Sequence, residues 1–518
     1  MTEITSPKTA AINALRAEPM GLARLGRGIE KESLRVLPDG RLSPARHPSA
    51  LGAPLTHPTI TTDFSEAQLE LITAVHRSVD DCLQQLQTVH KFVYQNIGDE
   101  LLWPASMPCM VGDADQVPIG QYGSANIAMA KTIYRRGLGV RYGRLMQTIS
   151  GIHYNFSVSD ELWQTLGIHH QDDRTAAYFG LIRNFRRWSW LLLYLFGASP
   201  AVCKSFTRSI SHELQEFDEG SLHLPHATSL RMGPLGYQSE AQAQLRISYN
   251  SLAAYTSSML DALTTEYPPY AAAGIKRGGE YQQLNSNILQ IENEFYGTIR
   301  PKRTIESGER PVNALLARGV EYVEVRCVDL NPYLPLGLDA NQVRFMDTFL
   351  LLCLLAESPP DDEAEIARMA ANQLAVVERG RDPALRLAND HNESVAIEQW
   401  ATEILAACAE LAALQDTADG STAYTEALAA QQAKVQDPSL TPSAKVLTDM
   451  QAQQIPFFRL TMQQAEKFRS AALAEPLDAE MQKAYEEVSA HSLREKDALE
   501  NAENVPFEVF LAQYLALN

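Results

Sequence analysis

The stretch Gly28-Ile-Glu-Lys-Glu-Ser-Leu-Arg-Val36 carries two glutamates, Glu30 and Glu32, two residues apart. Side chains alternate between the two faces of a β-strand, so a strand here points both carboxylates to the same face of a sheet. The end of this stretch also favours a β-hairpin over residues 32–42, with Pro38-Asp39-Gly40 as its turn. The sequence therefore predicts a sheet that carries a carboxylate pair on one face.

Two later stretches repeat the arrangement of a polar pair on one strand face. In residues 152–158, His153 and Asn155 share one face, and the apolar residues that alternate with them take the other. In residues 322–328, Glu324 and Arg326 share a face opposite two valines and a cysteine. For any one strand, a polar face in contact with water is the simpler interpretation. Three such strands with Glu, His and Arg at the paired positions favour a functional site.

A fourth segment, residues 63–70, supplies further carboxylates. The spacing of apolar residues predicts a helix over residues 65–97, with Asp63 and Glu66 as an ordinary capping box at its start. Glu70 follows Asp63 by two helical turns, so both carboxylates can face the same pocket. A solvent-facing position for Glu70 is equally compatible with this spacing.

The remaining pattern indicates an α+β protein with two regions. Helices are predicted over residues 176–195 and 239–264, among the short strands of the first region. From about residue 358 onward the sequence predicts one helix after another, over residues 361–379, 393–415 and 463–503, the last interrupted at Pro476. We expect a catalytic α+β core over residues 1–356 and an acidic helical region over residues 357–518, packed on the core as one integrated unit.

The chain of 518 residues carries a formal net charge of -19, and this charge is unevenly distributed. Residues 357–518 hold 28 acids and 12 bases, whereas the first 356 residues hold 35 acids and 32 bases. So acidic a chain repels nucleic acid and anionic membranes, which excludes both as main partners. We interpret the acidic surplus of the second region as the solvated face of packed helices.

The sequence also indicates where the protein works. Its first 20 residues are polar and contain Pro7 and Pro19, unlike a signal peptide, and the longest apolar stretch, residues 190–203, is too short to span a bilayer. The six cysteines lie far apart without a CxxC pair, which argues against a zinc ribbon and fits reduced thiols in a cytosol. We therefore expect a cytoplasmic protein.

The polar strand faces favour metal-dependent chemistry. Clustered carboxylates repel one another unless cations neutralise them. Oxygen ligands together with one imidazole suit Mg²⁺ or Mn²⁺ rather than zinc held by thiolates. The sequence has no Gly-x-x-x-x-Gly-Lys phosphate loop, no Gly-x-Ser-x-Gly elbow and no dinucleotide fingerprint. Serine hydrolysis, thiol redox chemistry and Rossmann dehydrogenation are therefore poorly supported.

Six short motifs follow one another in order between residues 21 and 356. They are Arg27-Gly-Ile-Glu-Lys-Glu-Ser-Leu-Arg35, Thr61-Thr-Asp-Phe-Ser-Glu66, Met146-Gln-Thr-Ile-Ser-Gly-Ile-His-Tyr-Asn-Phe156, Ala227-Thr-Ser-Leu-Arg231, Ser286-Asn-Ile-Leu-Gln-Ile-Glu-Asn-Glu-Phe-Tyr296 with Arg300-Pro-Lys-Arg303, and Tyr322-Val-Glu-Val-Arg326. Together they resemble bacterial glutamate–cysteine ligase of the proteobacterial type. That family uses ATP to join the γ-carboxyl of L-glutamate to the amine of L-cysteine through γ-glutamyl phosphate, the first step of glutathione synthesis. The resemblance implies an antiparallel catalytic sheet similar to that of glutamine synthetase.

The resemblance also implies a role for each group of residues. Two or three Mg²⁺ ions, or Mn²⁺ in their place, would be held by Glu30, Glu32, Asp63, Glu70, His153 and Glu324. Arg231 and Arg326 would meet the substrate carboxylates and the transferred phosphoryl group, which makes Arg231, Glu324 and Arg326 the implied catalytic residues. The cysteine pocket would be shaped by Phe64, Tyr134, Leu138, Gln147, Tyr237 and Tyr296.

Two smaller groups complete the implied site. Ile149 and Asn155 would border the glutamate site, and Asn287 and Arg303 would contact the nucleotide. We expect a monomer whose partners are its small-molecule substrates. Two alternatives remain open: a related γ-glutamyl ligase that uses a different amine acceptor, and a non-catalytic scaffold whose helical tail binds a partner.

Overall fold

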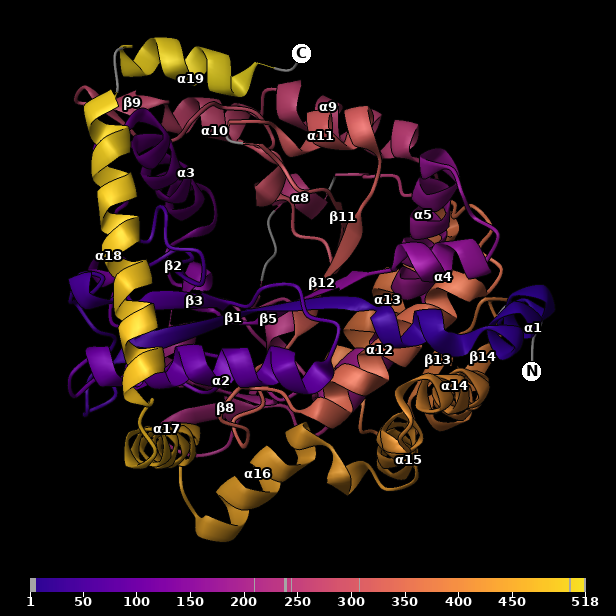
Figure 1. The fold of residues 1–518 in the computed structure, drawn as a ribbon. Coiled ribbons are helices and arrows are strands. Elements are labelled where there is room, and N and C mark those ends of the chain that lie inside the picture. Colours follow the sequence, from indigo (N-terminus) through magenta and orange to yellow (C-terminus); the bar gives the residue numbers. More distant parts are fainter. Residues whose placement is uncertain are drawn as a thin grey trace.

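The centre of the computed structural model, which describes residues 6–208, 210–236, 240–243, 245–306, 308–502 and 505–516, is an antiparallel sheet. Its strands are β1 (Gly26–Val36), β2 (Ile60–Thr62), β3 (Gln68–Ile72), β4 (Leu101–Leu102), β5 (Ile152–Ser157), β11 (Ile299–Lys302) and β12 (Tyr322–Val328). They are ordered β11-β12-β5-β1-β3-β2, and β4 pairs with the end of β1. Helices surround this sheet (Figure 1), so the prediction of a mixed fold with an antiparallel sheet is confirmed.

Three small sheets and the helices complete the described fold. The small sheets are formed by β6 (Ala201–Cys203), β7 (Gln215–Glu216) and β8 (Ser221–His223), by β9 (Lys276–Arg277) and β10 (Glu280–Tyr281), and by β13 (Arg386–Ala388) and β14 (Ser394–Ala396). The helices are α1 (Thr9–Ala17), α2 (Val79–Asn96), α3 (Asn126–Tyr142), α4 (Asp160–Thr165), α5 (Gln171–Trp188), α6 (Trp190–Phe196), α7 (Lys204–Thr207), α8 (Glu240–Ala243), α9 (Leu252–Thr264), α10 (Pro268–Ala273), α11 (Pro311–Arg318), α12 (Ala340–Leu355), α13 (Glu363–Arg379), α14 (Ile397–Asp419), α15 (Ala423–Gln436), α16 (Pro442–Gln453), α17 (Phe457–Ala474), α18 (Ala479–Ala502) and α19 (Phe507–Leu515). Among the described residues, no helix has both the length and the apolar character that a membrane crossing requires.

One face of the central sheet is buried in the main hydrophobic core. Tyr154 and Phe156 of β5 and Val323 of β12 belong to this core, which they share with residues of α5, α6 and α12. Arg27 of β1 is also buried here, and its guanidinium lies 2.9 Å from the Asp347 carboxylate of α12. The opposite face of the sheet is therefore the one left for the predicted polar side chains.

The predicted helix over residues 65–97 is wrong in its first part. Residues 68–72 form β3, which pairs with both β1 and β2, and the helix α2 begins only at Val79. Asp63 and Glu66 lie in the turn between β2 and β3 and do not form a helix cap. The Glu66 carboxylate instead accepts backbone N–H groups of His47 and Gln121, at 2.9 and 3.1 Å.

Other predictions are confirmed or need correction in part. The hairpin after β1 is confirmed by the bridge between Val36 and Leu42, and the helical tail is confirmed by α13, α14, α17 and α18. The predicted helix over residues 239–264 is divided into α8 and α9. The expectation of six reduced thiols is wrong for one pair, because the fold brings Cys109 and Cys203 together as a disulfide.

Candidate active site

Strand register brings the predicted carboxylates together on one face of the sheet. Glu30 of β1 lies opposite His153 of β5, and Glu32 of β1 lies opposite Glu70 of β3. Glu324 of β12 lies opposite Asn155 of β5, which is two residues after His153 and on the same face. Directly opposed residues of an antiparallel pair point to the same side, so these side chains meet above the sheet. Glu70 reaches the site from a strand and not from a helix.

His153 lies at the centre of these carboxylates. Its Nδ1 is 3.0 Å from Glu30 Oε2 and 3.9 Å from Glu324 Oε1, and its Nε2 is 3.8 Å from Glu32 Oε1. One ligand atom each of Glu30, Glu70 and His153 lie within 4.8 Å of one another. Carboxylate oxygens and one imidazole at this spacing fit a divalent cation such as Mg²⁺ or Mn²⁺.

Crowding and burial change the proton affinity of two of these glutamates. Burial, reinforced by the charges of Glu30 and Asp63, raises the pKa of Glu70 well above its ordinary value. Burial and the charge of Asp63 raise the pKa of Glu32 to about 8. Without a cation both carboxyl groups therefore keep their protons to a higher pH than an exposed glutamate does, and a bound cation would displace these protons.

The other two glutamates are kept ionised by their neighbours. Burial disfavours the charged form of Glu324, but the cations Lys302 and Arg326 outweigh it and hold the pKa of Glu324 well below its ordinary value. Burial likewise acts against Glu30, but its hydrogen bond with His153 gives a lowered pKa. The pKa of His153 is lowered by burial and by Arg326. A neutral imidazole beside ionised carboxylates is the form that binds metal ions.

Three cations border the acidic cluster around Glu324. The Glu324 carboxylate is 3.1 Å from Arg326 Nη1, 3.4 Å from Lys302 Nζ and 4.0 Å from Arg300 Nη1. Arg300 and Lys302 belong to β11, where Arg300 lies directly opposite Glu324. Guanidinium and ammonium groups next to an acidic cluster that could hold a cation are suited to phosphate and carboxylate ligands.

Arg231 enters the site across a glycine. Its Nη2 donates to the backbone carbonyl of Arg326 at 2.8 Å, and its Nη1 is 3.6 Å from the Asp329 carboxylate. A Cβ atom on Gly151 would lie 2.0 Å from that Nη2, so only glycine leaves room for the guanidinium. The N–H of Gly151 also donates to Glu32 Oε2 at 2.6 Å. Gly151 therefore positions both a carboxylate and an arginine.

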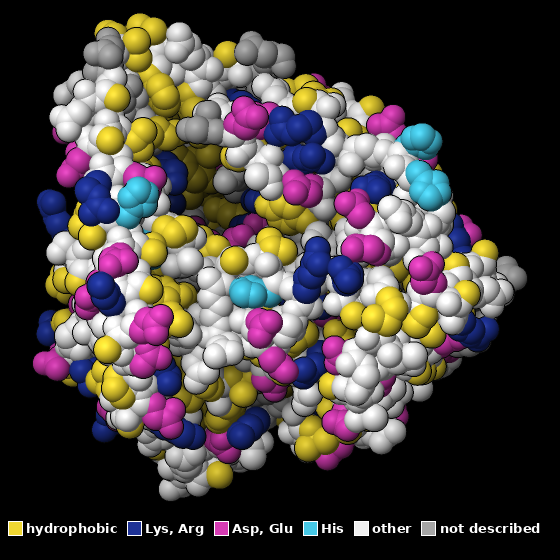
Figure 2. All heavy atoms as spheres, viewed as in Figure 1, with side chains coloured by type: hydrophobic (Ala, Val, Ile, Leu, Met, Phe, Trp, Pro, Cys, Tyr) yellow, Lys and Arg dark blue, Asp and Glu magenta, His cyan; other side chains and the backbone are white. Residues whose placement is uncertain are grey.

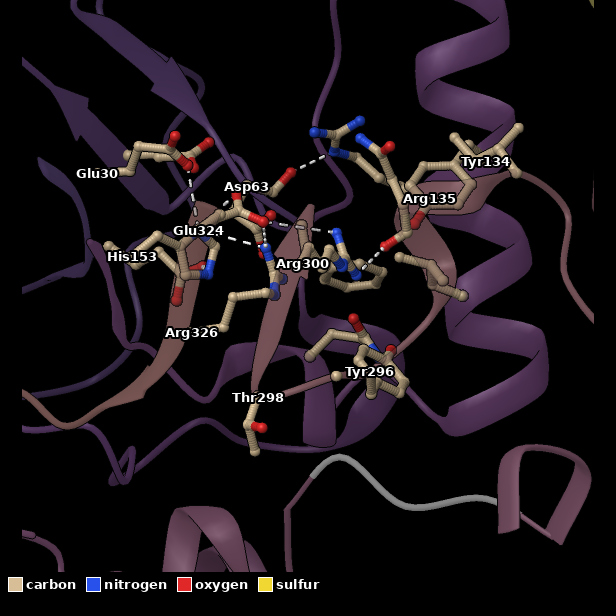
Figure 3. A pocket seen from close by; sticks show the side chains of 18 of the residues that line it. Glu30, Asp63, Tyr134, Arg135, His153, Tyr296, Thr298, Arg300, Glu324 and Arg326 are labelled. Atoms are coloured by element: carbon tan, nitrogen blue, oxygen red, sulfur yellow. Dashed lines mark hydrogen bonds and ion pairs between the residues drawn. The ribbon is translucent and has the colours of Figure 1, made fainter. Parts of the chain in front are cut away.

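The groups described above line one cavity of about 500 Å³, which opens on the face shown in Figure 2. Figure 3 shows Glu30, His153 and Glu324 on one side of this cavity and Tyr134 and Tyr296 on the other. The cavity is also lined by the predicted residues Glu32, Asp63, Phe64, Glu70, Leu138, Gln147, Arg231 and Arg326. The second side carries an ordered polar group, because Gln147 Nε2 donates to the Tyr296 hydroxyl at 2.9 Å.

The structure does not bring every predicted residue into the cavity. Asn155 borders it through a hydrogen bond from Nδ2 to Glu30 Oε1 at 2.8 Å, and Ile149 lies behind it with its carbonyl bonded to Gln68. Asn287 lies outside the cavity lining and its amide donates to the Leu263 carbonyl, and Arg303 is outside as well, with its guanidinium on the Arg318 carbonyl. Tyr237 lies outside the described residues.

Several cavity residues were missed by sequence reasoning. They are Lys131, Arg135, Asn293, Thr298, Arg300, Lys302, Gln373 and Tyr514. Arg300 and Lys302 were within reach, because alternate residues of a strand share a face and Arg303 must then point the other way. Gln373 and Tyr514 come from the helical tail and could not be found from any local pattern.

A sheet face with four glutamates and a neutral imidazole, bordered by arginines and a lysine, has the chemistry expected of an enzyme that handles anionic substrates together with divalent cations. Comparison with known proteins identifies the family within this class. The sequence profile of the family "Glutamate-cysteine ligase" matches residues 12–376. The chain belongs to the glutamate–cysteine ligase family.

Individual relatives extend this match over the whole chain. The chain is 50% identical over 495 residues to the glutamate–cysteine ligase of Pseudomonas entomophila, covering 94% of this chain and 93% of that protein. It is 47% identical over 522 aligned positions to the glutamate–cysteine ligase of Pseudomonas aeruginosa, and the alignment covers 100% of this chain and 98% of that protein. The crystal structure of glutamate–cysteine ligase from Francisella tularensis in complex with AMP is similar to this structure, with a TM-score of 0.89 and 34% sequence identity. The match covers 95% of this chain and 97% of that chain.

Proposed function

We propose that this chain ligates the γ-carboxyl of L-glutamate to the amine of L-cysteine with hydrolysis of ATP to ADP and phosphate, the first step of glutathione synthesis. The observation that carries this proposal is the convergence of carboxylates, His153 and arginines in one cavity, in a chain of this family. The Francisella tularensis relative was solved in complex with AMP, which supports a nucleotide as a substrate here.

The acidic face supplies the charge balance that this chemistry needs. A carboxylate is a poor electrophile, so the γ-carboxyl of glutamate must first become an acyl phosphate. We assign the metal ligands to Glu30, Glu32, Asp63, Glu70, His153 and Glu324, and Mg²⁺ held there would neutralise the phosphate oxygens. The lowered pKa of His153 and of Glu324 supports their role, because each is already in its ligating form.

The arginines and the lysine that border the acidic cluster are assigned to the anionic groups of the substrates. Arg326 and Arg231, fixed by the contact between Arg231 and the Arg326 carbonyl, are assigned to the substrate carboxylate and the transferred phosphoryl group. Arg300 and Lys302 extend this positive border along β11 and are assigned to the nucleotide phosphates. They replace Asn287 and Arg303, which lie outside the cavity.

The amine acceptor is assigned to the opposite side of the cavity. Phe64, Tyr134, Leu138, Gln147 and Tyr296 provide an apolar wall with a few polar groups, which suits a small thiol side chain. The acceptor amine must approach the acyl phosphate from this side and expel phosphate. Its attack forms the amide bond and breaks the bond between the acyl carbon and the phosphoryl oxygen.

Several expectations from the sequence stay proposals. They are the likeness of the catalytic sheet to that of glutamine synthetase, a monomer, and a cytoplasmic location. The division into a core over residues 1–356 and an integrated helical region over residues 357–518 also stays a proposal. It is supported by Gln373 and Tyr514, which bring the second region into the cavity of the first.

The function is tested by measuring ADP release with L-glutamate, Mg²⁺ and a panel of amines, with mass detection of the product. We expect L-cysteine to give the highest kcat/KM and γ-glutamylcysteine to form in a 1:1 ratio with ADP. A stronger response to an amine without a thiol would favour the alternative ligase. No ADP release with any amine would contradict ligase activity altogether.

A further inference from the structure

The last described helix, α19, lies against the catalytic core rather than at the free end of the tail. Figure 1 shows it next to α3, at the end of the long helix α18. Phe507 and Leu511 of α19 are buried together with Ala130 and Ile133 of α3. Its opposite side is exposed, with Val509 at 45% of full exposure. The amphipathic helix therefore packs its apolar side on α3.

Helix α3, on which α19 packs, lines the catalytic cavity. Its residues Lys131, Tyr134, Arg135 and Leu138, which are spaced by three or four positions and so share one side, line the cavity. Tyr514, in the last turn of α19, lines the cavity itself. Tyr514 also packs on the same hydrophobic cluster as Tyr134, so the two rings belong to one wall.

A buried ion pair holds the end of α19 in this position. Arg310 donates to both carboxylate oxygens of Glu292, the shortest contact being 2.8 Å, and both side chains are less than 10% exposed. Its Nη1 donates to the backbone carbonyls of Tyr514 and Leu515 at 3.5 and 3.3 Å. Carbonyls at a helix C-terminus carry partial negative charge, so a guanidinium stabilises them. Glu292 directly follows Ile291, which also lines the cavity.

The start of α19 is fixed as well. Asn126 Nδ2 of α3 donates to the carbonyl of Val505 at 3.0 Å, and Lys276 pairs with Glu508 at 3.2 Å. Stacking on Phe510, with ring centroids 5.7 Å apart, further limits the orientation of Tyr514. Contacts at both ends of α19 therefore hold the helix in place, and stacking on Phe510 orients the Tyr514 ring within it.

We propose that α19 forms one wall of the acceptor side of the cavity and that Tyr514 limits the size of the amine that the enzyme accepts. This inference rests on the proposed ligase function. The side chain of Tyr514 packs on the same cluster as Tyr134, which Figure 3 shows on the side of the cavity opposite Glu30, His153 and Glu324, where the phosphoryl group is assigned. Arg310 is a positioning residue, because it holds the backbone that carries Tyr514.

The proposal is tested with two acceptors that differ only in length. They are L-2-aminobutyrate, in which a methyl group replaces the thiol of cysteine, and L-2-aminohexanoate, which is two carbons longer. We expect Tyr514→Ala to raise the kcat/KM ratio of the long to the short acceptor by at least about tenfold, because room for each methylene in an apolar pocket is worth about tenfold or more. Tyr514→Trp should lower that ratio, and the KM for ATP should stay unchanged in both variants.

Matched variants separate this role from a general loss of structure. Gln513→Ala, at the exposed neighbouring position, should leave the ratio at the wild-type value. Arg310→Gln should change the ratio in the same direction as Tyr514→Ala, and the double variant should show no further change. Arg310→Lys, which keeps one charged donor, should restore part of the wild-type selectivity.

Each outcome has a distinct meaning. An active wild-type enzyme whose Tyr514→Ala and Tyr514→Trp variants both keep the wild-type ratio overturns this inference and leaves the ligase function intact. A change in the KM for ATP in place of the acceptor ratio also overturns it. A wild-type protein that releases no ADP with glutamate and any amine contradicts the proposed function itself.

Discussion

Replacing Gly151 by alanine is expected to displace Arg231 and to remove most of the activity without unfolding the protein. The backbone of Gly151 is not in the left-handed region, so an alanine fits its conformation. The new Cβ would lie 2.0 Å from Nη2 and 2.5 Å from Cζ of Arg231, whereas ordinary contacts begin at 3.4 Å. The guanidinium must therefore retreat by more than 1 Å, roughly the difference between these distances.

The size of the effect follows from how tightly Arg231 is held. Its side chain is 3% exposed, and its retreat breaks the 2.8 Å hydrogen bond to the Arg326 carbonyl. A misplacement of this size near reacting atoms costs about 100-fold in rate, or about 2.7 kcal/mol of transition-state stabilisation. The loss of one hydrogen bond lowers the free energy of unfolding by only about 1 kcal/mol.

The assay is ADP release with varied L-glutamate, together with urea unfolding of each variant. We expect kcat/KM for glutamate to fall about 100-fold in Gly151→Ala. The control is Gly180→Ala in α5, where the new Cβ would lie 3.6 Å from its nearest neighbour, an ordinary contact. That variant should keep full activity and gain up to about 1 kcal/mol of stability. Wild-type kcat/KM in Gly151→Ala would refute the assigned contact between Gly151 and Arg231.

Two further predictions concern stability. Burial lowers the pKa of His57 to about 4, and its neutral Nδ1 accepts the backbone N–H groups of Thr59 and Ile60. The unfolded chain therefore binds a proton at this histidine more readily than the folded protein does. As a result, the free energy of unfolding decreases as the pH falls below about 6.5. We expect the loss of unfolding free energy between pH 7 and pH 5, measured by urea unfolding, to be roughly 2 kcal/mol larger in the wild type than in His57→Asn, and equal losses in both proteins would contradict this. Reducing the Cys109–Cys203 disulfide, whose cysteines are 94 positions apart, should lower the free energy of unfolding by about 4 kcal/mol. Dithiothreitol should have no such effect on Cys109→Ser, and an unchanged urea midpoint in the wild type would count against a stabilising disulfide.

The strands that local pattern predicts well are those with one buried face. Residues 152–158 and 322–328 alternate clearly because one side packs in the core, and β5 and β12 match these predictions to within a residue. Strand β3 is harder, because its five residues also fit the spacing of a longer helix. Its pairing with β1, which is more than 30 residues away, decides the structure, and no local pattern contains that information.

The site divides in the same way. The metal-ligand candidates were predictable because several of them share a strand face with another carboxylate or with an imidazole. Carboxylates gathered in this way repel one another unless a cation neutralises them. Arg300 and Lys302 follow from the alternation of side chains along a strand once residues 299–302 are taken as a strand, and the register of β11 against β12 then sets Arg300 opposite Glu324. Tyr514 and Gln373 enter the cavity only through packing of the tail, and burial of Cys109 beside Cys203 likewise depends on the complete fold.

The central claim, that the acidic sheet face binds divalent cations needed for ligation, is tested most directly by ADP release from Glu324→Gln in the presence of glutamate, cysteine and Mg²⁺. The substitution keeps the shape of a buried side chain that is 2% exposed and removes its charge. We predict a loss of about a thousandfold in turnover in a protein that still unfolds cooperatively in urea, although at a lower midpoint, because Arg326 and Lys302 lose a buried anionic partner. Unaltered turnover in a folded Glu324→Gln protein would contradict the assignment of the metal site.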